Sequence, residues 1–243
     1  MRLTRVYVDT PIAAGNNVVI EGSAVNHITR VLRLRSGDTL TLFDGSGGEY
    51  GARIEEFHKD TVVVTVDEHR TLDRESPLSL TLAQGISRGD RMDWIIRKAT
   101  ELGTSRIVPV FTKRSMVKLD EKQAENKVQH WRRIAVAACE QSGRNRVPDL
   151  ALPLDFSEVL RDGEQASTRL LLSPTGDLRV DDLEAPGKGI TVLIGPEGGL
   201  AEREQEAAVA AGFKPVRMGP RVLRTETAAI AALTIIQSRF GDL

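Results

Sequence analysis

Two glycine-proline turns carry the residue types in this sequence that are best suited to hold a small ligand. The first lies in residues 192–200, which read VLIGPEGGL: a run of strand-forming residues passes directly into glycines and then into a helix-forming segment. Backbone amides beside a helix start often bind phosphate, but the Glu197 carboxylate would repel one. We therefore expect a ligand that is neutral or cationic near Glu197. We call residues 195–199 the first glycine loop.

A second turn, in residues 219–233 (GPRVLRTETAAIAAL), also follows a short strand-like run. Gly219 and Pro220 begin it, Arg221 and Arg224 follow, and an apolar helix is predicted to start at Thr225 as N-cap. We call residues 219–224 the second glycine loop. Loops at the carboxyl ends of parallel strands meet at one sheet edge, where α/β proteins bind ligands. The two loops are therefore expected to form one site, although each Gly-Pro pair could instead be only a tight connection.

The spacing of these residues excludes the common nucleotide and metal motifs. GPEGGL has neither the G-x-G-x-x-G spacing of a dinucleotide fold nor the Gly-Lys-Ser/Thr of a P-loop. The four histidines are scattered, and Cys139 is the only cysteine, so the sequence predicts no disulfide and no metal site.

The elements that must position these loops fall into two patterns. Up to about residue 70, short strand-like runs separated by Gly, Asn and Asp turns predict a small β-barrel, interrupted by one helix over residues 23–34 with Ser23 as its cap. Residues 71–77 (TLDRESP) break both periodicities, and we place the domain boundary between residues 72 and 73. Strands and helices then alternate, which predicts an α/β domain with a largely parallel sheet. Asp90 and Asp120 are expected helix N-caps, and Gly103 and Gly143 expected C-caps.

Charge and hydropathy narrow the class of partner. With 33 Lys and Arg against 34 Asp and Glu, the chain is not a basic coat, and any nucleic-acid contact must use a local patch. The N-terminus lacks the apolar core of a signal peptide, and no apolar run approaches the roughly 20 residues of a membrane helix. We therefore expect a cytoplasmic protein without membrane contact.

Several segments together resemble one enzyme family. LIGPEGGL, GPRVLRTETA, AACEQSGRNRVP and KATELG are similar to signature segments of the 16S ribosomal RNA uracil-N3 methyltransferases, a branch of the SPOUT superfamily, and HITRVLRLRSGDTLTLFDG resembles the PUA-like barrel of that family. The resemblance implies a PUA-like RNA-binding β-barrel over residues 1–72, and a SPOUT α/β methyltransferase domain with a deep C-terminal trefoil knot over residues 73–243. It also implies a homodimer that acts on 16S rRNA or the small ribosomal subunit.

The same resemblance implies S-adenosyl-L-methionine (SAM) as the cofactor. Its sulfonium cation and adenine suit backbone carbonyls and amides, and the acid in the first glycine loop is then no anomaly. Carried over by position, the cofactor-binding residues are Leu172, Ser173, Ile194, Gly195, Pro196, Glu197, Gly198, Gly199, Met218, Gly219, Leu223, Arg224, Thr225 and Ala228.

Methylation at N3 of uracil requires loss of an imide proton, so the site needs a base or cations that stabilise the developing oxyanions. Glu226 could be the base or a first-turn carboxylate favoured by the helix dipole. Glu140 and Gln141 could face substrate or solvent, and Cys139 is more typical of core packing. The candidate cations are Arg88, Arg144, Arg146, Arg221 and Arg224, with Arg224 the first choice.

Arginines of the barrel are the candidates for RNA contact, because phosphate contacts position a substrate while the pocket reads the base. Ordinary surface charge is the alternative. Two alternative functions stay open: an enzyme of the same superfamily that acts on another RNA position, and a non-catalytic RNA-binding module. The candidate RNA-binding residues are Arg2, Arg5, Arg30, Arg33 and Arg35.

Overall fold

The computed structural model describes residues 4–117, 119–162 and 168–243, which form two compact units. The first unit contains the chain up to Glu75 together with residues 136–147, and the second contains Ser76–Ala135 and Pro148–Leu243. The boundary expected after residue 72 lies three residues from the end of the first segment. Residues 136–147, which the sequence prediction placed in the second domain, belong to the first unit. Arg2 lies outside the described residues.

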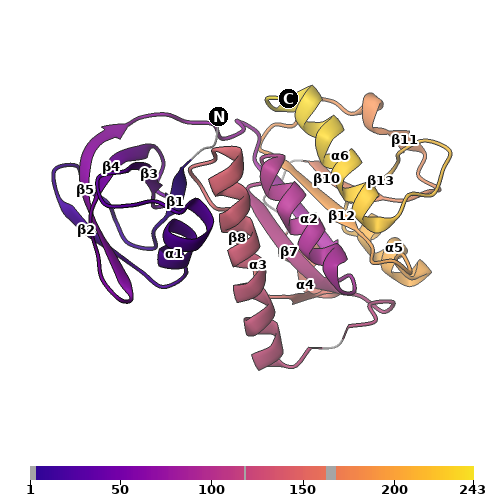
Figure 1. Ribbon diagram of the computed structural model, residues 1–243. Coiled ribbons are helices and arrows are strands. Elements are labelled where there is room, and N and C mark those ends of the chain that lie inside the picture. The colour runs from indigo at the N-terminus through magenta and orange to yellow at the C-terminus, as the bar shows by residue number, and fades with distance from the viewer. Residues whose placement is uncertain (1–3, 118, 163–167) are drawn as a thin grey trace. The chain divides into compact units, whose positions relative to one another are not determined.

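The first unit is a curled five-stranded sheet in the order β1-β3-β4-β5-β2, drawn in indigo and purple in Figure 1. All pairs are antiparallel except β1 with β3, and the register shifts twice between β4 and β5. Alternate residues point inward, and Ile20, Leu42, Ile54 and Val64 belong to its buried core. The short strands predicted from the sequence are confirmed as β1 (Arg5–Tyr7), β2 (Asn17–Glu21), β3 (Thr39–Phe43), β4 (Glu49–Phe57) and β5 (Thr61–Arg70).

The single α-helix predicted over residues 23–34 is wrong in kind. After Gly22, α1 spans only Ser23–Asn26, and the chain continues as a π-helix, η1 (His27–Leu32). Ser23 is wrong as the N-cap, because Gly22 occupies that position and Ser23 is already the first helical residue. The Thr29 hydroxyl donates to the Val25 carbonyl oxygen at 2.7 Å, and such a bond competes with the regular backbone ladder. Arg33, with a left-handed φ of 58°, ends the element.

The second unit is the predicted α/β domain, and its central sheet is parallel throughout. The strand order is β11-β13-β10-β12-β6-β7-β8, and β9 pairs with β7. The strands are β6 (Leu80–Gly85), β7 (Arg106–Phe111), β8 (Asp149–Leu150), β9 (Leu154–Asp155), β10 (Thr168–Leu172), β11 (Leu178–Arg179), β12 (Ile190–Ile194) and β13 (Lys214–Arg217).

Helices cover both faces of this sheet. The 3₁₀-helix η3 (Val180–Asp182) packs against the last α-helix, α6, which also contacts α2 and β12. A buried cluster that includes Leu171, Leu193, Val159 and Phe213 fills the other face, beneath α4 and α5. No helix in the described part of the chain is long and apolar enough to cross a membrane. The α-helices are α2 (Asp90–Glu101), α3 (Glu121–Ser142), α4 (Phe156–Asp162), α5 (Glu202–Ala210) and α6 (Thr225–Phe240).

Three of the predicted helix ends follow the sequence signals. Asp120 Oδ1 accepts the backbone N–H of Gln123 at 2.8 Å, which confirms it as a cap. Gly103 (φ 78°) and Gly143 (φ 87°) end their helices in the left-handed conformation, as predicted. Asp90 is wrong as an N-cap, because Gly89 occupies the cap position and Asp90 is already the first helical residue.

Candidate active site

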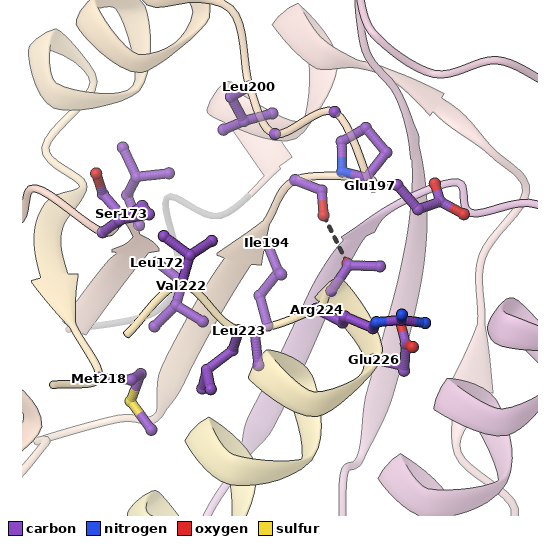
Figure 2. Close-up of a pocket in the computed structure, with 18 of the residues that line it drawn as sticks. Leu172, Ser173, Ile194, Glu197, Leu200, Met218, Val222, Leu223, Arg224 and Glu226 are labelled. Atoms are coloured by element: carbon purple, nitrogen blue, oxygen red, sulfur yellow. Dashed lines mark hydrogen bonds between the residues drawn. The ribbon is translucent and has the colours of Figure 1, made fainter. Parts of the chain in front are cut away.

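A cavity of about 550 Å³ lies in the second unit where β10, β12 and β13 end. This is the carboxyl edge of the parallel sheet, the edge at which the sequence predicted a site. Figure 2 shows the lining residues converging from these strand ends and from the start of α6. All residues predicted to contact a cofactor, from Leu172 to Ala228, line this one cavity. The structure thus brings the two glycine loops together, and the individual contacts to a cofactor stay predictions.

Glycine is required in the first glycine loop because the chain folds tightly on itself. A Cβ at Gly195 would lie 2.9 Å from the backbone carbon of Gly199 and 2.9 Å from the nitrogen of Leu200. Gly199 has a left-handed φ of 66°, and its N–H donates to the Pro196 carbonyl oxygen at 2.8 Å. A Cβ at Gly199 or Gly219 would meet no atom within 4 Å. The loop is therefore compact at Gly195 and open at Gly199.

The predicted N-cap role of Thr225 is wrong. Arg224 occupies the cap position of α6 without a side-chain cap bond, and Thr225 is the first helical residue. Its hydroxyl instead donates to the carbonyl oxygen of Gly195 at 2.7 Å, the dashed line in Figure 2. The start of α6 is thereby fastened to the first glycine loop.

Two acids line the cavity, and Arg91 lies between them. Glu197 Oε1 accepts the backbone N–H of Arg88 at 3.0 Å and Arg91 Nη1 at 2.9 Å. Partial burial acts to raise the pKa of the Glu197 carboxyl, but these hydrogen bonds outweigh it and the pKa is lowered. Arg91 Nε lies 4.0 Å from Glu226 Oε1, while Glu226 Oε2 is buried without a partner among the described residues.

Arg221 and Arg224 are the cavity-lining cations that the sequence identified. Both are exposed, and neither guanidinium has an ion pair or hydrogen bond within the ranges that the structure describes. The side chain of Arg88 does not line the cavity, and only its backbone N–H reaches Glu197.

Sequence reasoning missed two other arginines of the cavity wall, Arg91 and Arg114. Arg91 lies in the first turn of α2, and Arg114 follows β7, where its Nη1 donates to the Gly198 carbonyl oxygen at 2.9 Å. Both follow the carboxyl ends of strands in the parallel sheet, and this position was the available signal.

Comparison with known proteins identifies the family. The model for the RNA methyltransferase domain matches residues 74–237. The chain belongs to the RNA methyltransferase family. A second model, for the PUA domain of RNA methyltransferases, matches residues 20–67.

Relatives and solved structures agree with this family over nearly the whole chain. The ribosomal RNA small subunit methyltransferase E of Bacillus subtilis is 36% identical and covers 89% of this chain and 88% of its own length. The protein of that name from Buchnera aphidicola of Acyrthosiphon pisum is 30% identical, with coverage of 99% and 95%.

Two structures solved with S-adenosylmethionine are also similar. A Legionella pneumophila protein has a TM-score of 0.96 at 38% identity and full coverage of both chains. The ribosomal RNA small subunit methyltransferase E of Neisseria gonorrhoeae has a TM-score of 0.91 at 37% identity and 99% coverage of both. The predicted fold class, a SPOUT α/β methyltransferase domain after a PUA-like domain, is confirmed, while the threading of the knot stays a prediction.

Arg144 must be removed from the catalytic candidates of this RNA methyltransferase. It is 5% exposed in the first unit, where its Nη2 and Nε donate to Glu75 Oε2 at 2.6 and 2.9 Å. Glu75 Oε1 also accepts the backbone N–H groups of Asn145 and Arg146, each at 3.0 Å. The signature segment GRNRVP thus supplies a buried structural ion pair that fastens residues 144–146 to Glu75.

Arg5 must likewise be removed from the RNA-binding candidates. Its side chain is 3% exposed and forms an ion pair with Glu49 through Nη1. Arg5 Nη2 donates to the Arg144 carbonyl oxygen at 2.9 Å and to Asn145 Oδ1 at 2.6 Å. A guanidinium with these partners inside the unit does not reach RNA phosphates. Arg30, Arg33 and Arg35 are exposed, as an RNA-binding surface requires.

The end of α3 serves packing in the first unit. Glu140 Oε1 accepts the Tyr7 backbone N–H at 3.1 Å, and burial raises the pKa of this carboxyl. Gln141 is exposed. Burial also raises the pKa of the Cys139 thiol to about 12, so at neutral pH it is a protonated core side chain, as its apolar neighbours in the sequence indicated.

Proposed function

We propose that this chain transfers a methyl group from SAM to RNA of the small ribosomal subunit, at N3 of a uracil. The observation that carries the proposal is a cavity at the carboxyl edge of the sheet, in which both glycine loops meet two arginines that have no partner among the described residues. Relatives named ribosomal RNA small subunit methyltransferase E support the substrate class. The N3 position rests on the signature segments quoted above.

The apolar residues and the open backbone of the cavity fit SAM. Leu172, Ile194 and Leu223 offer apolar contact to an adenine ring, and the backbone at Gly199 and Gly219 is open where a side chain would stand. The Glu197 carboxylate lines the same cavity, but it is already paired with Arg91. When bound, SAM supplies an electrophilic methyl group carried on a sulfonium.

The residues around the cavity then have distinct roles in the reaction. Arg224 and Arg221, which have no other partner in the described structure, stabilise the negative charge that develops on the uracil oxygens as the N3 proton leaves. Glu226, in the first turn of α6, is the carboxylate closest in sequence to Arg224 and accepts that proton. Arg91 pairs with Glu197 and also lies 4.0 Å from Glu226, so one guanidinium lies between the two acids.

Mass spectrometry of ribosomal RNA from cells with and without this protein tests the proposal. We expect one methylated uridine in small-subunit RNA to lose its N3 methyl group when the protein is absent. A change at another nucleotide would favour the alternative, a SPOUT methyltransferase with a different target. No change in any RNA would contradict both.

Because the proposed substrate is ribosomal RNA, we also propose a cytoplasmic location.

The exposed arginines of the first unit are proposed to contact RNA phosphates. Replacing Arg30, Arg33 and Arg35 together with alanine should weaken RNA binding and flatten its salt dependence, because each lost phosphate contact removes about 0.7–0.9 from the slope of log K against log salt. Affinity for small-subunit RNA measured from low to moderate salt reports this slope. Lys59→Ala, in an exposed turn of the same unit, is the control. An unchanged slope in the triple variant would show that these arginines are ordinary surface charges that do not contact RNA.

We further propose that the chain is a homodimer. Four apolar residues of α6 could serve an interface, Ile230, Leu233, Ile235 and Ile236, but Leu233 and Ile236 are fully buried in the core of the second unit. Ile230 and Ile235 are partly exposed, and Trp94 on α2, which packs against α6, is 45% exposed. Sedimentation should show twice the 26.6 kDa chain mass at micromolar concentration, and Trp94→Glu should shift it to the single-chain mass. A parent protein that sediments at 26.6 kDa would contradict the dimer.

A further inference from the structure

The side chain of Gln84 is fully buried at the carboxyl end of β6, in the centre of the parallel sheet. Its Nε2 lies 3.0 Å from Thr225 Oγ1, 3.3 Å from the Gly195 carbonyl oxygen and 3.0 Å from the Gly85 carbonyl oxygen. Thr225 and Gly195 both line the cavity, and Gln84 does not. A buried amide therefore lies behind the cavity wall and contacts both parts of it.

The orientation of this amide follows from its surroundings. Thr225 already donates its hydroxyl hydrogen to the Gly195 carbonyl, so the groups facing Gln84 are all acceptors. Turning the amide over would place its oxygen against two carbonyl oxygens. The observed orientation leaves Gln84 Oε1 buried without a partner among the described residues. A buried polar atom without a partner is costly, so the bonds made by Nε2 are the reason for a glutamine at this position.

The hydrogen bonds from Thr225 and Gln84 also determine how the Gly195 peptide is presented at the cavity. The Gly195 carbonyl accepts from both Thr225 and Gln84, which uses its lone pairs inside the protein. Its peptide is thereby held in one orientation, at the residue where the loop approaches Gly199 closely. The first turn of α6 is held to the same carbonyl. Gln84 thus contacts both the first glycine loop and the first residue of α6.

We propose that Gln84 is a positioning residue for the cofactor cavity: it acts through Gly195 and Thr225 and holds the two glycine loops in the arrangement that binds SAM. This inference rests on the proposed function, because it takes SAM as the ligand. Gln84 lies outside the cavity, and its hydrogen bonds are expected to raise the affinity for SAM as well as to pack the sheet.

The test is calorimetric binding of SAM to the full chain. Gln84→Met keeps the length of the side chain and removes its donors, and we expect binding about tenfold weaker, since one or two hydrogen bonds that fix the site are lost. Gln84→Glu keeps the shape of the side chain but replaces the amide nitrogen with a carboxylate oxygen. This oxygen would face the three acceptors that Nε2 contacts in the parent. We expect this variant to bind still more weakly near pH 8, and to recover as the pH falls toward about 5.5, where the buried carboxyl protonates and donates one bond. A role in packing alone predicts that the isosteric Glu variant binds like the parent at every pH.

Gln237→Met is the matched control. Gln237 is also fully buried in the second unit, and its Nε2 donates to the Leu102 carbonyl oxygen at 2.8 Å, but it lies near the far end of α6, outside the cavity. This variant should lose thermal stability and keep parental affinity. Thr225→Val tests the network from its other side and should weaken binding by a factor similar to that of Gln84→Met.

The outcomes separate the inference from the proposed function. A parent protein that does not bind SAM would overturn the proposed function. A parent that binds, with Gln84→Met and Gln84→Glu equal to it, would overturn only the role of Gln84. Unfolding of both Gln84 variants while Gln237→Met folds would also overturn it, because Gln84 would then serve the stability of the sheet.

Discussion

Arg224→Ala is expected to slow methyl transfer by about 10² while SAM binds within a few-fold of the parent affinity. Arg224 lines the cavity at the start of α6, and its guanidinium has no competing partner in the described part of the chain. The charge that it stabilises exists on uracil only as the N3 proton leaves, so its loss affects the transition state more than the bound cofactor.

Single-turnover assays at saturating RNA measure this effect, and calorimetry measures the cofactor affinity. Arg97→Ala, an exposed arginine of α2 outside the cavity, should behave as the parent in both. Transfer at the parental rate by Arg224→Ala would move the charge-stabilising role to Arg221, the other unpaired arginine of the wall.

Gly195→Ala is expected to abolish SAM binding, with a loss of at least about 10² in affinity. The added Cβ would lie 2.9 Å from two backbone atoms of Gly199 and Leu200, so the first glycine loop must open. Backbone atoms cannot swing aside as a flexible side chain does, and a misplaced loop loses many contacts together. Gly199→Ala should disturb the loop itself less, because its Cβ meets no protein atom within 4 Å and the left-handed backbone costs about 1 kcal/mol.

Calorimetry with circular dichroism on the same samples separates binding from folding. Gly51→Ala on β4, where the nearest atom to an added Cβ is 3.4 Å away, is the control for a glycine substitution in the other unit. A folded Gly195→Ala protein that binds SAM within tenfold of the parent would show that the loop tolerates this displacement.

The sequence predicted the features that depend on local patterns. Strand and turn signals gave the strands β1 to β5, and two Gly-Pro turns at strand ends were enough to predict one cavity. The helix after Gly22 was predicted in the wrong form, because local hydrophobic spacing does not reveal the Thr29 bond to Val25 that accompanies the π-helix.

The burial of Arg144 could not be predicted from its neighbours. Its partner Glu75 is 69 positions away, in the segment TLDRESP that reads as a charged linker. Arg91 is the opposite case, a residue of the cavity that the sequence did not identify. An arginine in a helix that begins with Asp90 resembles surface charge, and only the fold places it near Glu197 and Glu226. Pairing across long sequence separation decides which arginines are free, and sequence spacing carries little information about it.

The first unit is built from two segments that are separated in the sequence, so its second segment is synthesised well after its first. A nascent chain that has emerged only as far as Glu75 already contains Arg5 and Glu49, but it lacks the Arg144 carbonyl and the Asn145 side chain that complete the Arg5 site. At about 5–20 residues per second, the intervening roughly 70 residues take several seconds to synthesise. During that interval the Arg5 guanidinium lacks two of the acceptors that it has in the folded unit, because these come from a segment translated in the middle of the other unit.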